Sequence, residues 1–311
     1  MTLFNILKNI VAVLIFLLIA PAMLDGIKKQ YTRYVTPQTQ VGVITIKGIL
    51  CDSNHYNKYL HTYFKDSNIK AILLKIECPG GAAGTSQALF TEIQALKKEY
   101  PKPVVALVEN VCASGGYYVA CAADYIIAPG SALVGSIGVC LPYYFQLHGL
   151  LEHLKVDYVS IKAGAYKSVG DPFTNITTEQ KALLQSVLDD TYEQFTVDVA
   201  QQRKLSPDTA HIWADGKIFS GNQARKLGLI DQIGSAYMAI QILKEKALIE
   251  GDIEWIKPPE ESSAWSLLTG SSNSDDDSMF GSMTKKMGAL LQEQTVTTAL
   301  DSVLPNSLHM R

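Results

Sequence analysis

The cysteines of this chain of 311 residues offer neither a pairing pattern nor a ligand pattern. They number five, no two of them form a CxxC pair, and no histidine stands at ligand spacing from them. A disulfide framework or a zinc site needs such spacings. We therefore expect no disulfide, no metal and no cofactor, and we expect small core residues at Cys51, Cys78, Cys112, Cys121 and Cys140.

An excess of charge of one sign is also missing. The chain has 27 Lys and Arg residues against 30 Asp and Glu residues, which gives a formal net charge of -3. This balance gives the chain no general attraction to nucleic acid, so no nucleic-acid partner is expected. Hydrophobic residues make up 47% and charged residues 18%, a globular composition that fits one large domain or two small ones.

One run without charge lies near the N-terminus, between Lys8 and Asp25. About 20 apolar residues are needed to cross a bilayer, and the run is shorter unless residues 3–7 extend it while Lys8 snorkels. A cleaved signal peptide and a buried N-terminal helix are the alternatives. However, Pro21 gives a poor cleavage context, and polar interruptions at helical spacing are lacking. We predict an uncleaved membrane anchor over residues 1–27.

Strand and helix patterns alternate through the centre of the chain. Residues 41–50, 71–77 and 104–109 are apolar and β-branched, whereas residues 85–99 carry apolar side chains at helical spacing. This rhythm predicts an α/β fold with a parallel sheet that is covered by helices. Further strands are expected at 125–128 and 156–161, and further helices at 115–123, 177–203, 207–213, 221–227 and 236–248. Thr177 and Gln180 form a capping box for the longest helix.

The composition divides the chain into five parts. A polar stalk at 28–40 follows the anchor, and the globular domain spans 41–258. The acidic, Ser-rich segment 259–283 is expected to be a disordered linker, because it is too polar to form a core. A C-terminal tail at 284–311 has the pattern of an amphipathic helix.

Three motifs offer the parts of a hydrolase site: a nucleophile, a base and donors for an oxyanion. Ser114 follows an expected strand and begins an expected helix, where a hydroxyl is exposed at the positive end of the helix dipole. Gly80 and Gly81 follow another strand and can aim a backbone N–H at an oxyanion. Lys167 has glycine and apolar neighbours. Each motif alone also fits an ordinary structural role as a helix cap, a loop or a surface lysine.

Taken in order, the motifs resemble those of one family. They read PGG at 79–81, ASGGYY at 113–118, GSIG at 135–138, GAYK at 164–167 and GKIFSGNQARKLGLIDQIG at 216–234. This series is similar to that of signal peptide peptidases of the SppA/SohB type. The resemblance implies a serine endopeptidase with a Ser–Lys dyad and a crotonase-like fold. That fold is a βαβ spiral of parallel sheets and covering helices, related to the Clp peptidase and preceded by one transmembrane helix.

The resemblance implies a role for each motif. The family nucleophile matches Ser114, the general base matches Lys167, and the serine that orients the lysine matches Ser136. The oxyanion hole matches backbone N–H groups in two glycine turns, namely those of Gly115, Gly80 and Gly81. A neutral lysine suits this chemistry, because it can take the serine proton and return it to the leaving nitrogen.

The resemblance also implies partners and a location. Members cut remnant signal peptides and other short, apolar or extended peptides, and they assemble into homo-oligomeric rings with shared active sites. They lie in the cytoplasmic (inner) membrane as single-pass proteins, with the catalytic domain on the periplasmic side. The positive charges after the anchor weakly favour the opposite side. The chain departs from the family at Cys78 and Val134, where Ser and Thr are common, but neither position supplies a catalytic group.

Three alternatives stand beside this interpretation. A Clp-like Ser-His-Asp peptidase would need a base among the histidines, but none lies in a suitable motif, and His148 and His153 lie on an expected amphipathic helix. A crotonase-fold acyl-CoA enzyme would not explain Ser114 and Lys167 in their matched motifs. A non-catalytic membrane scaffold would be favoured by changes at these two positions, and both are intact.

Overall fold

The computed structural model describes residues 38–141 and 145–259, together with scattered positions between 13 and 27. Most of the predicted anchor at 1–27 and of the predicted stalk at 28–40 lies outside these residues. So do the predicted tail and nearly all of the predicted linker. In the part of the chain that is described, no helix is long and apolar enough to cross a membrane.

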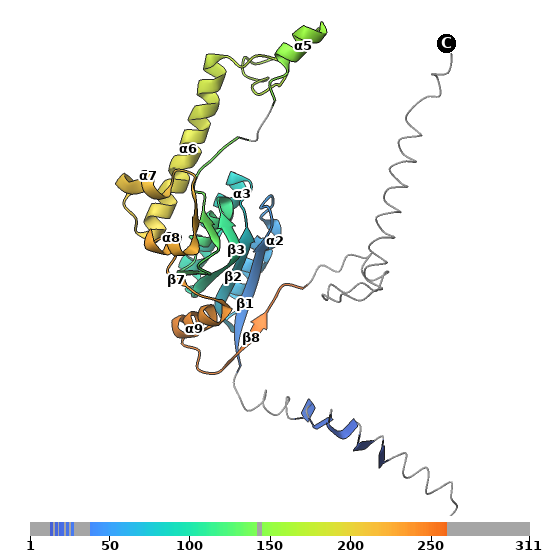
Figure 1. Ribbon diagram of the computed structural model, residues 1–311. Helices are drawn as coiled ribbons and strands as arrows, with labels where there is room; N and C mark the ends of the chain where they lie inside the picture. The colour runs from blue at the N-terminus through green and yellow to red at the C-terminus, as the bar shows by residue number, and fades with distance from the viewer. Residues whose placement is uncertain are drawn as a thin grey trace, which may run out of the picture. The chain divides into compact units, whose positions relative to one another are not determined.

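A mixed, mostly parallel sheet of eight strands forms the centre of the domain (Figure 1). Its order is β6-β5-β3-β2-β1-β8, and β4 lies off this path, where it pairs with β3 and β7. Among the described strands, only β5 and β6 pair antiparallel. The strands are β1 (Gln38–Lys47), β2 (Ile69–Cys78), β3 (Val104–Ala113), β4 (Tyr125–Ala128), β5 (Leu133–Gly135), β6 (Ile218–Ser220), β7 (Gln232–Ile233) and β8 (Asp252–Ile256).

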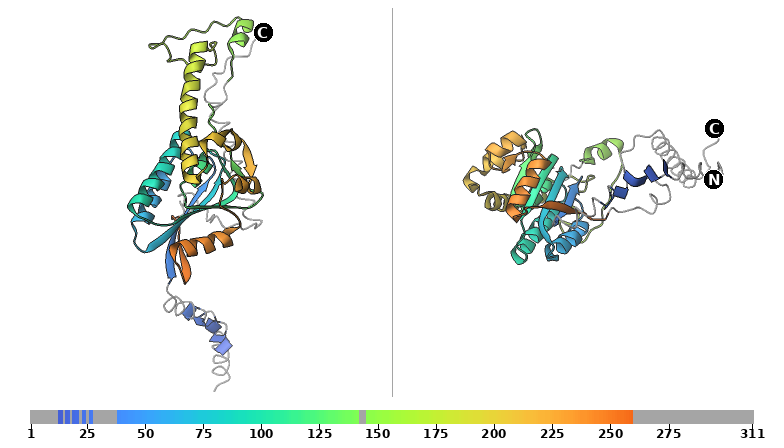
Figure 2. Two further views of the ribbon diagram at one scale, coloured as in Figure 1. Left: turned by 90° about the vertical axis from the view of Figure 1, so that its left-hand side faces the viewer. Right: turned by 90° about the horizontal axis from the view of Figure 1, so that it is seen from below.

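Helices cover both faces of the sheet (Figure 2). Successive residues of a strand point to opposite faces, so Leu74 packs in the core under one set of helices and Leu73 in the core on the other side. Both are buried, as is typical of strands in a parallel sheet. The helices of the first face are α2 (Asn54–Lys65), α3 (Ala83–Glu99) and α4 (Gly115–Ala120), and α9 (Ala236–Ala247) covers the second.

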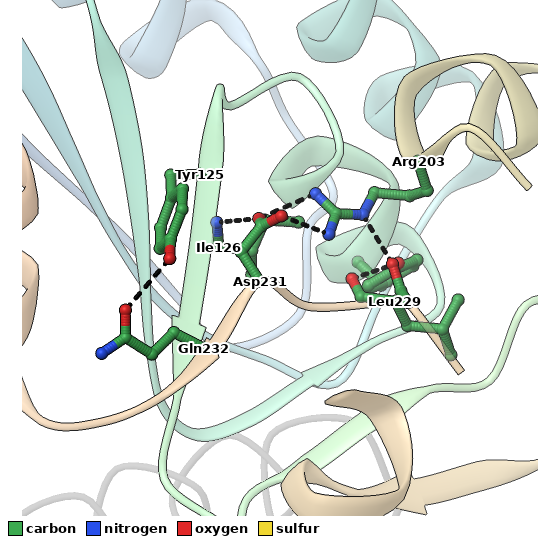
Figure 3. A network of polar contacts seen from close by, with 8 residues as sticks. Tyr125, Ile126, Arg203, Leu229, Asp231 and Gln232 are labelled. Atoms are coloured by element: carbon green, nitrogen blue, oxygen red, sulfur yellow. Dashed lines mark hydrogen bonds and ion pairs between the residues drawn. The ribbon is translucent and has the colours of Figure 1, made fainter. Parts of the chain in front are cut away.

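A buried ion pair fixes the C-terminal end of α6 (Thr178–Arg203) to the sheet (Figure 3). Arg203 donates two hydrogen bonds to the Asp231 carboxylate, at 2.8 and 2.9 Å, and a third from Nε to the Gly228 carbonyl at 3.0 Å. The same carboxylate accepts the Ile126 N–H at 2.7 Å. The Arg203 side chain is only 8% exposed, so loss of either partner would leave the other charge without its counter-ion in a poorly solvated place.

Residues 145–194, which we name the arm, contain no buried side chain. The arm comprises α5 (His148–Leu154), an irregular segment and the N-terminal part of α6 (Figure 1). Burial along α6 begins only at Phe195. Many apolar side chains of the arm face solvent, with Ile161 97% and Val159 80% exposed. Within a single chain the arm therefore has no core of its own.

Several predicted elements are confirmed. The strand at 125–128 is β4, and the predicted strands around it appear as β1, β2 and β3, each somewhat longer than expected or shifted by a few residues. The capping box of α6 is present, because the Thr177 hydroxyl accepts the Gln180 N–H at 3.2 Å and the Gln180 side chain accepts the Thr177 N–H at 3.1 Å. The remaining predicted helices appear as η1 (Pro207–Thr209) with α7 (Ala210–Trp213), α8 (Gly221–Lys226) and α9.

Other predictions are wrong. Residues 156–161 form no strand, because they lie in the arm and pair with no other strand among the described residues. Cys51 and Cys140 are exposed rather than part of the core, whereas the other three cysteines are buried. The patterns also fail to predict α2 and the short strands β6, β7 and β8. Strands of two to five residues are too short for alternation to be recognised.

Candidate active site

Ser114 occupies a sharp turn between β3 and α4. Its backbone has φ 51° and ψ −125°, a left-handed φ that costs a non-glycine residue about 1–3 kcal/mol. The turn is held on both sides, since the Ser114 N–H donates to the Gly135 carbonyl at 2.7 Å and its carbonyl accepts the Tyr118 N–H at 3.0 Å. A strained strand-to-helix turn of this kind is known from hydrolases, where it exposes the oxygen of a nucleophilic serine.

The Ser114 hydroxyl does not act as a helix cap. A capping serine accepts the N–H of the second or third residue of its helix. Ser114 stands at the N-cap of α4 but makes no such bond. Within the described residues its hydroxyl has no hydrogen-bond partner at all. The structural role that the sequence left open therefore does not account for this serine.

Two glycine turns lie directly against Ser114. A Cβ added to Gly80, which has φ 122°, would lie 2.7 Å from the Ser114 Cβ. A Cβ added to Gly115 would lie 3.4 Å from the Gly81 nitrogen, so these two backbones are also close. Gly115 is the first residue of α4, and its N–H has no acceptor within the helix. The turns thus offer backbone donors beside the hydroxyl.

Cys78 supports the first glycine turn from the end of β2. Its thiol donates a weak hydrogen bond to the Gly80 carbonyl at 3.5 Å, and its backbone is packed so tightly that a Cβ on Gly116 would lie 2.6 Å from the Cys78 oxygen. Burial raises the pKa of the Cys78 thiol, which keeps it neutral. Cys78, which stands where the family commonly has Ser, is therefore a small, uncharged side chain that supports the Gly80 turn.

Ser136 lies beside Ser114. The parallel strands β3 and β5 pair with Ala113 opposite Gly135, so the next residue of each strand leaves the sheet at the same edge. Ser136 also has φ 51°, and its N–H donates to the Lys217 carbonyl at 2.7 Å. The structure thus brings five predicted site residues to one edge: Ser114, Ser136, Gly80, Gly81 and Gly115.

Lys167 is not brought to this edge within one chain. It lies in a turn of the arm, where its N–H donates to the Gly164 carbonyl at 3.2 Å and its side chain is exposed. Its ammonium group has no hydrogen bond or ion pair with any described residue. The predicted nucleophile and the predicted base therefore lie in two different regions of the chain.

Sequence reasoning missed two residues beside the site. Ser86 is fully buried, and its oxygen lies where a Cβ on Gly115 would come within 2.1 Å. Its position three residues before Leu89, on the core face of α3, is the signal that could have found it. Lys217 touches Ser136 through its carbonyl, while its ammonium pairs with Asp215 at 2.5 Å.

Among the described residues, no histidine makes a hydrogen bond to the Ser114 hydroxyl. His61 pairs with Glu92 at 2.5 Å, and His148 pairs with Glu152 within α5 at 3.3 Å. The described part of the chain also contains no group of three or more His, Cys, Asp or Glu side chains that could hold a metal ion.

The chain is similar to several known proteins. The model of peptidase family S49 matches residues 96–250, a range that includes Ser114, Ser136 and Lys167 but begins after the Gly80–Gly81 turn. A protein of Methanocaldococcus jannaschii named as a putative protease is 40% identical over 196 residues, which are 63% of this chain and 62% of that protein.

Two further relatives carry more specific names. A signal peptide peptidase SppA of Enterococcus faecium, also named as putative, is 32% identical over 224 residues, 68% of this chain and 64% of that protein. The chloroplastic serine protease SPPA of Arabidopsis thaliana is 35% identical over 181 residues, 58% of this chain and 26% of that protein. The match thus spans less than two thirds of the length of these relatives.

Proposed function

Because the chain belongs to peptidase family S49, we propose that it is a membrane-anchored serine endopeptidase in which Ser114 is the nucleophile and Lys167 is the general base. The observation that carries the proposal is the state of Ser114. Its backbone is held in a strained turn, its hydroxyl is unpaired, and backbone donors of two glycine turns lie beside it. This combination is typical of a nucleophilic serine and is not needed for a serine with a structural role.

The reaction is an acyl transfer to serine. The Ser114 oxygen attacks the scissile carbonyl while its proton passes to a neutral Lys167 amine. The N–H groups of Gly115 and Gly81 stabilise the oxyanion that forms, since they are in place before the reaction begins. Collapse of the intermediate breaks the C–N bond, and the lysine returns its proton to the leaving amine. Water then attacks the acyl carbonyl while Lys167 takes its proton, the ester C–O bond breaks, and Lys167 returns the proton to the Ser114 oxygen.

The base of one chain serves the nucleophile of another in this proposal. Lys167 lies on an arm without a core, and the Ser114 hydroxyl is unpaired within the described chain. A homo-oligomeric ring would cover the exposed apolar side chains of the arm and would exclude water around the lysine. Desolvation disfavours the charged form of an amine, which is what a lysine base requires.

The proposed substrates are remnant signal peptides and other short apolar or extended peptides. An extended peptide can add as a further strand to a sheet edge near Ser114. The fold that we propose is crotonase-like, with residues 1–27 as a single-pass anchor in the cytoplasmic membrane and the catalytic domain on the periplasmic side. The names of two relatives, signal peptide peptidase and serine protease, support the proposed peptidase activity and substrate class.

Peptidase activity of the purified full-length chain on a fluorogenic apolar peptide tests the proposal. Ser114→Ala and Lys167→Ala are each expected to lower kcat by at least about 10³-fold. Lys181→Ala, an exposed lysine elsewhere on the arm, is the control and should keep full activity. Activity that survives in Lys167→Ala but is lost in Lys217→Ala would transfer the role of base to Lys217. A wild type that is silent on every peptide would favour the scaffold.

Mixing the two inactive variants tests the shared site. If the dyad forms between chains, Ser114→Ala and Lys167→Ala chains that are dissociated and reassembled together recover part of the activity, because some sites pair an intact serine with an intact lysine. If both groups come from one chain, the mixture stays as inactive as each variant alone.

A further inference from the structure

The arm is fixed to the rest of the molecule through the C-terminal part of α6. Phe195 and Val199 are the first buried apolar residues along this helix, and Arg203 closes it with the ion pair to Asp231. We call residues 195–203 the root of the arm. Just before the root, Tyr192 also donates to the Ala214 carbonyl at 2.6 Å. The residues further along the arm, including the turn that carries Lys167, take their direction from the packing of this end of α6.

The root packs on the helix that begins at the nucleophile. The rings of Phe195 and Tyr118 are stacked, with centroids 4.3 Å apart and planes 15° from parallel. Phe90 of α3 lies on the same tyrosine with its centroid at 5.1 Å. The Tyr118 hydroxyl donates a hydrogen bond to the Asp198 carboxylate of the root. Tyr118 is only 5% exposed and Asp198 is half-buried, so this bond is partly shielded from water.

Tyr118 also holds the nucleophile turn. Its backbone N–H donates to the Ser114 carbonyl at 3.0 Å, within a helix of only six residues. One residue thus contacts Ser114 with its backbone and the root of the arm with its side chain. The neighbouring Tyr117 contacts a different part of the molecule, because its hydroxyl donates to the Leu229 carbonyl. That carbonyl belongs to residues 38–141 and 195–259, which carry the sheet and which we call the sheet domain.

We propose that Tyr118 and Asp198 are a positioning pair that sets the direction of the arm, and hence the presentation of Lys167, relative to Ser114. The proposal rests on the assignment of Ser114 and Lys167 as nucleophile and base. It holds whether the arm serves its own chain or a second copy, since in a closed ring the direction of every arm is fixed by its own root.

The length of α6 makes this direction sensitive. From Asp198 to Thr178 the helix rises about 30 Å, so a tilt of about 5° at the root displaces its far end by about 2.6 Å. A displacement of about 1 Å between reacting groups can lower a rate about 10²-fold. When the hydrogen bond is removed, the stack on Phe195 and the Arg203–Asp231 ion pair keep the root packed, but the directional contact between Tyr118 and Asp198 is lost. Loss of the bond is therefore expected to lower turnover without unfolding the root.

The experiment compares Tyr118→Phe and Asp198→Ala with wild type in the full-length protein. Each variant should lower kcat about 10- to 100-fold with KM changed by less than about twofold, because the peptide site on the sheet is untouched. The double variant should be no worse than either single one, as expected for two ends of one interaction. Asp198→Asn, which keeps an acceptor oxygen, should restore most of the turnover.

Two matched controls separate positioning from structure. Tyr117→Phe removes a buried hydroxyl from the same helix but not from the root, so it should lower stability and leave kcat unchanged. Asp190→Asn changes a carboxylate on the exposed part of α6, where it accepts only from Gln194, and should change neither. Assembly state and thermal unfolding are measured for every variant. Tyr118→Phe and Asp198→Ala should assemble as wild type does and should lose about as much stability as Tyr117→Phe, because each removes one hydrogen bond of a buried tyrosine.

Lys167→Ala is assayed in parallel to identify the cause of a negative result. If Lys167→Ala is inactive but Tyr118→Phe and Asp198→Ala turn over at the wild-type rate, the positioning pair is wrong and the dyad stands. Additive losses in the double variant, or an equal loss of kcat in Tyr117→Phe, would also overturn the pair. If Lys167→Ala is fully active, the assignment of the base fails and the pair falls with it.

Discussion

The sheet domain and the arm keep their structure by different means. In the sheet domain, residues such as Ile72 and Leu74 are completely buried between strands and helices. In the arm, Ile161 and Val159 are almost fully exposed, although their side chains are as apolar. Burial of one such side chain contributes about 1.5–3 kcal/mol, so the arm forgoes a large part of the free energy that holds the sheet domain together.

The candidate site is divided along the same line. Ser114, Ser136 and the glycine turns stand on the carboxyl ends of buried strands, so their positions are fixed by the core. Lys167 stands on the arm, where only local hydrogen bonds fix it in a single chain. The comparison teaches that the sheet domain holds its part of the proposed site preformed. In our proposal, Lys167 joins this part when a second copy of the chain covers the arm.

The largest expected loss of stability comes from breaking the Arg203–Asp231 ion pair, which fixes the C-terminal end of α6 to the sheet domain. Arg203→Ala leaves the Asp231 carboxylate partly buried without its partner, which typically costs about 3–5 kcal/mol in the free energy of unfolding. Lys47→Ala removes the 73% exposed partner of Glu77 and should change the free energy of unfolding far less, because solvent screens this pair. Denaturant unfolding measures both. Equal losses of stability in the two variants would show that the Arg203–Asp231 pair does not fix α6 to the sheet domain.

The same substitution in each region gives the next contrast. Ile72→Ala is expected to lower the free energy of unfolding by about 2–5 kcal/mol, because it opens a cavity in the core. Ile161→Ala should change the stability of a dissociated chain by less than about 0.5 kcal/mol, since the side chain is 97% exposed. If a second copy covers the arm, Ile161→Ala weakens assembly instead. Sedimentation at several concentrations measures this loss.

This contrast also explains how far the fold could be predicted from sequence. The strands around Leu73 and Leu74 were predictable, because burial on both faces leaves a continuous apolar pattern. The pattern at 156–161 looks the same but forms no strand. A local apolar pattern indicates that side chains are to be buried. It does not say whether a neighbouring strand or another chain buries them. Short strands such as β7 arise from tertiary pairing alone and leave no periodicity.

The site divides in the same way. The place of Ser114 and the glycines could be predicted, because a strand, a small turn and a helix start are local features. The motif order then relates them to a family. Ser86 and the Tyr118–Asp198 contact could not be predicted, since they join segments through packing that no spacing encodes. The distance between Ser114 and Lys167 depends on the direction of α6, which is set by tertiary packing at its C-terminal end.

Gly80→Ala tests whether the sheet domain holds a preformed half of the site. The added Cβ would lie 2.7 Å from the Ser114 Cβ, at a φ of 122° that only glycine adopts easily, so the turn must shift. Disturbing an oxyanion donor costs about 10²–10³-fold in kcat. Gly84→Ala adds the same methyl group in α3 where nothing lies within 4 Å, and should leave kcat unchanged. An active Gly80→Ala would remove this turn from the oxyanion hole.

The smallest effect is expected at the far end of α6, where the arm depends on local interactions. Thr177→Ala removes the capping box with Gln180 and should destabilise the first turn of the helix by about 1 kcal/mol. Because this turn lies in the arm, the loss should appear as faster amide hydrogen exchange over the first residues of α6, with little change in global unfolding. Ser220→Ala removes a similar capping box from α8, which is packed in the sheet domain, and should lower global stability instead. If both variants change global unfolding equally, the arm folds as one unit with the sheet domain and the division between the two regions is wrong.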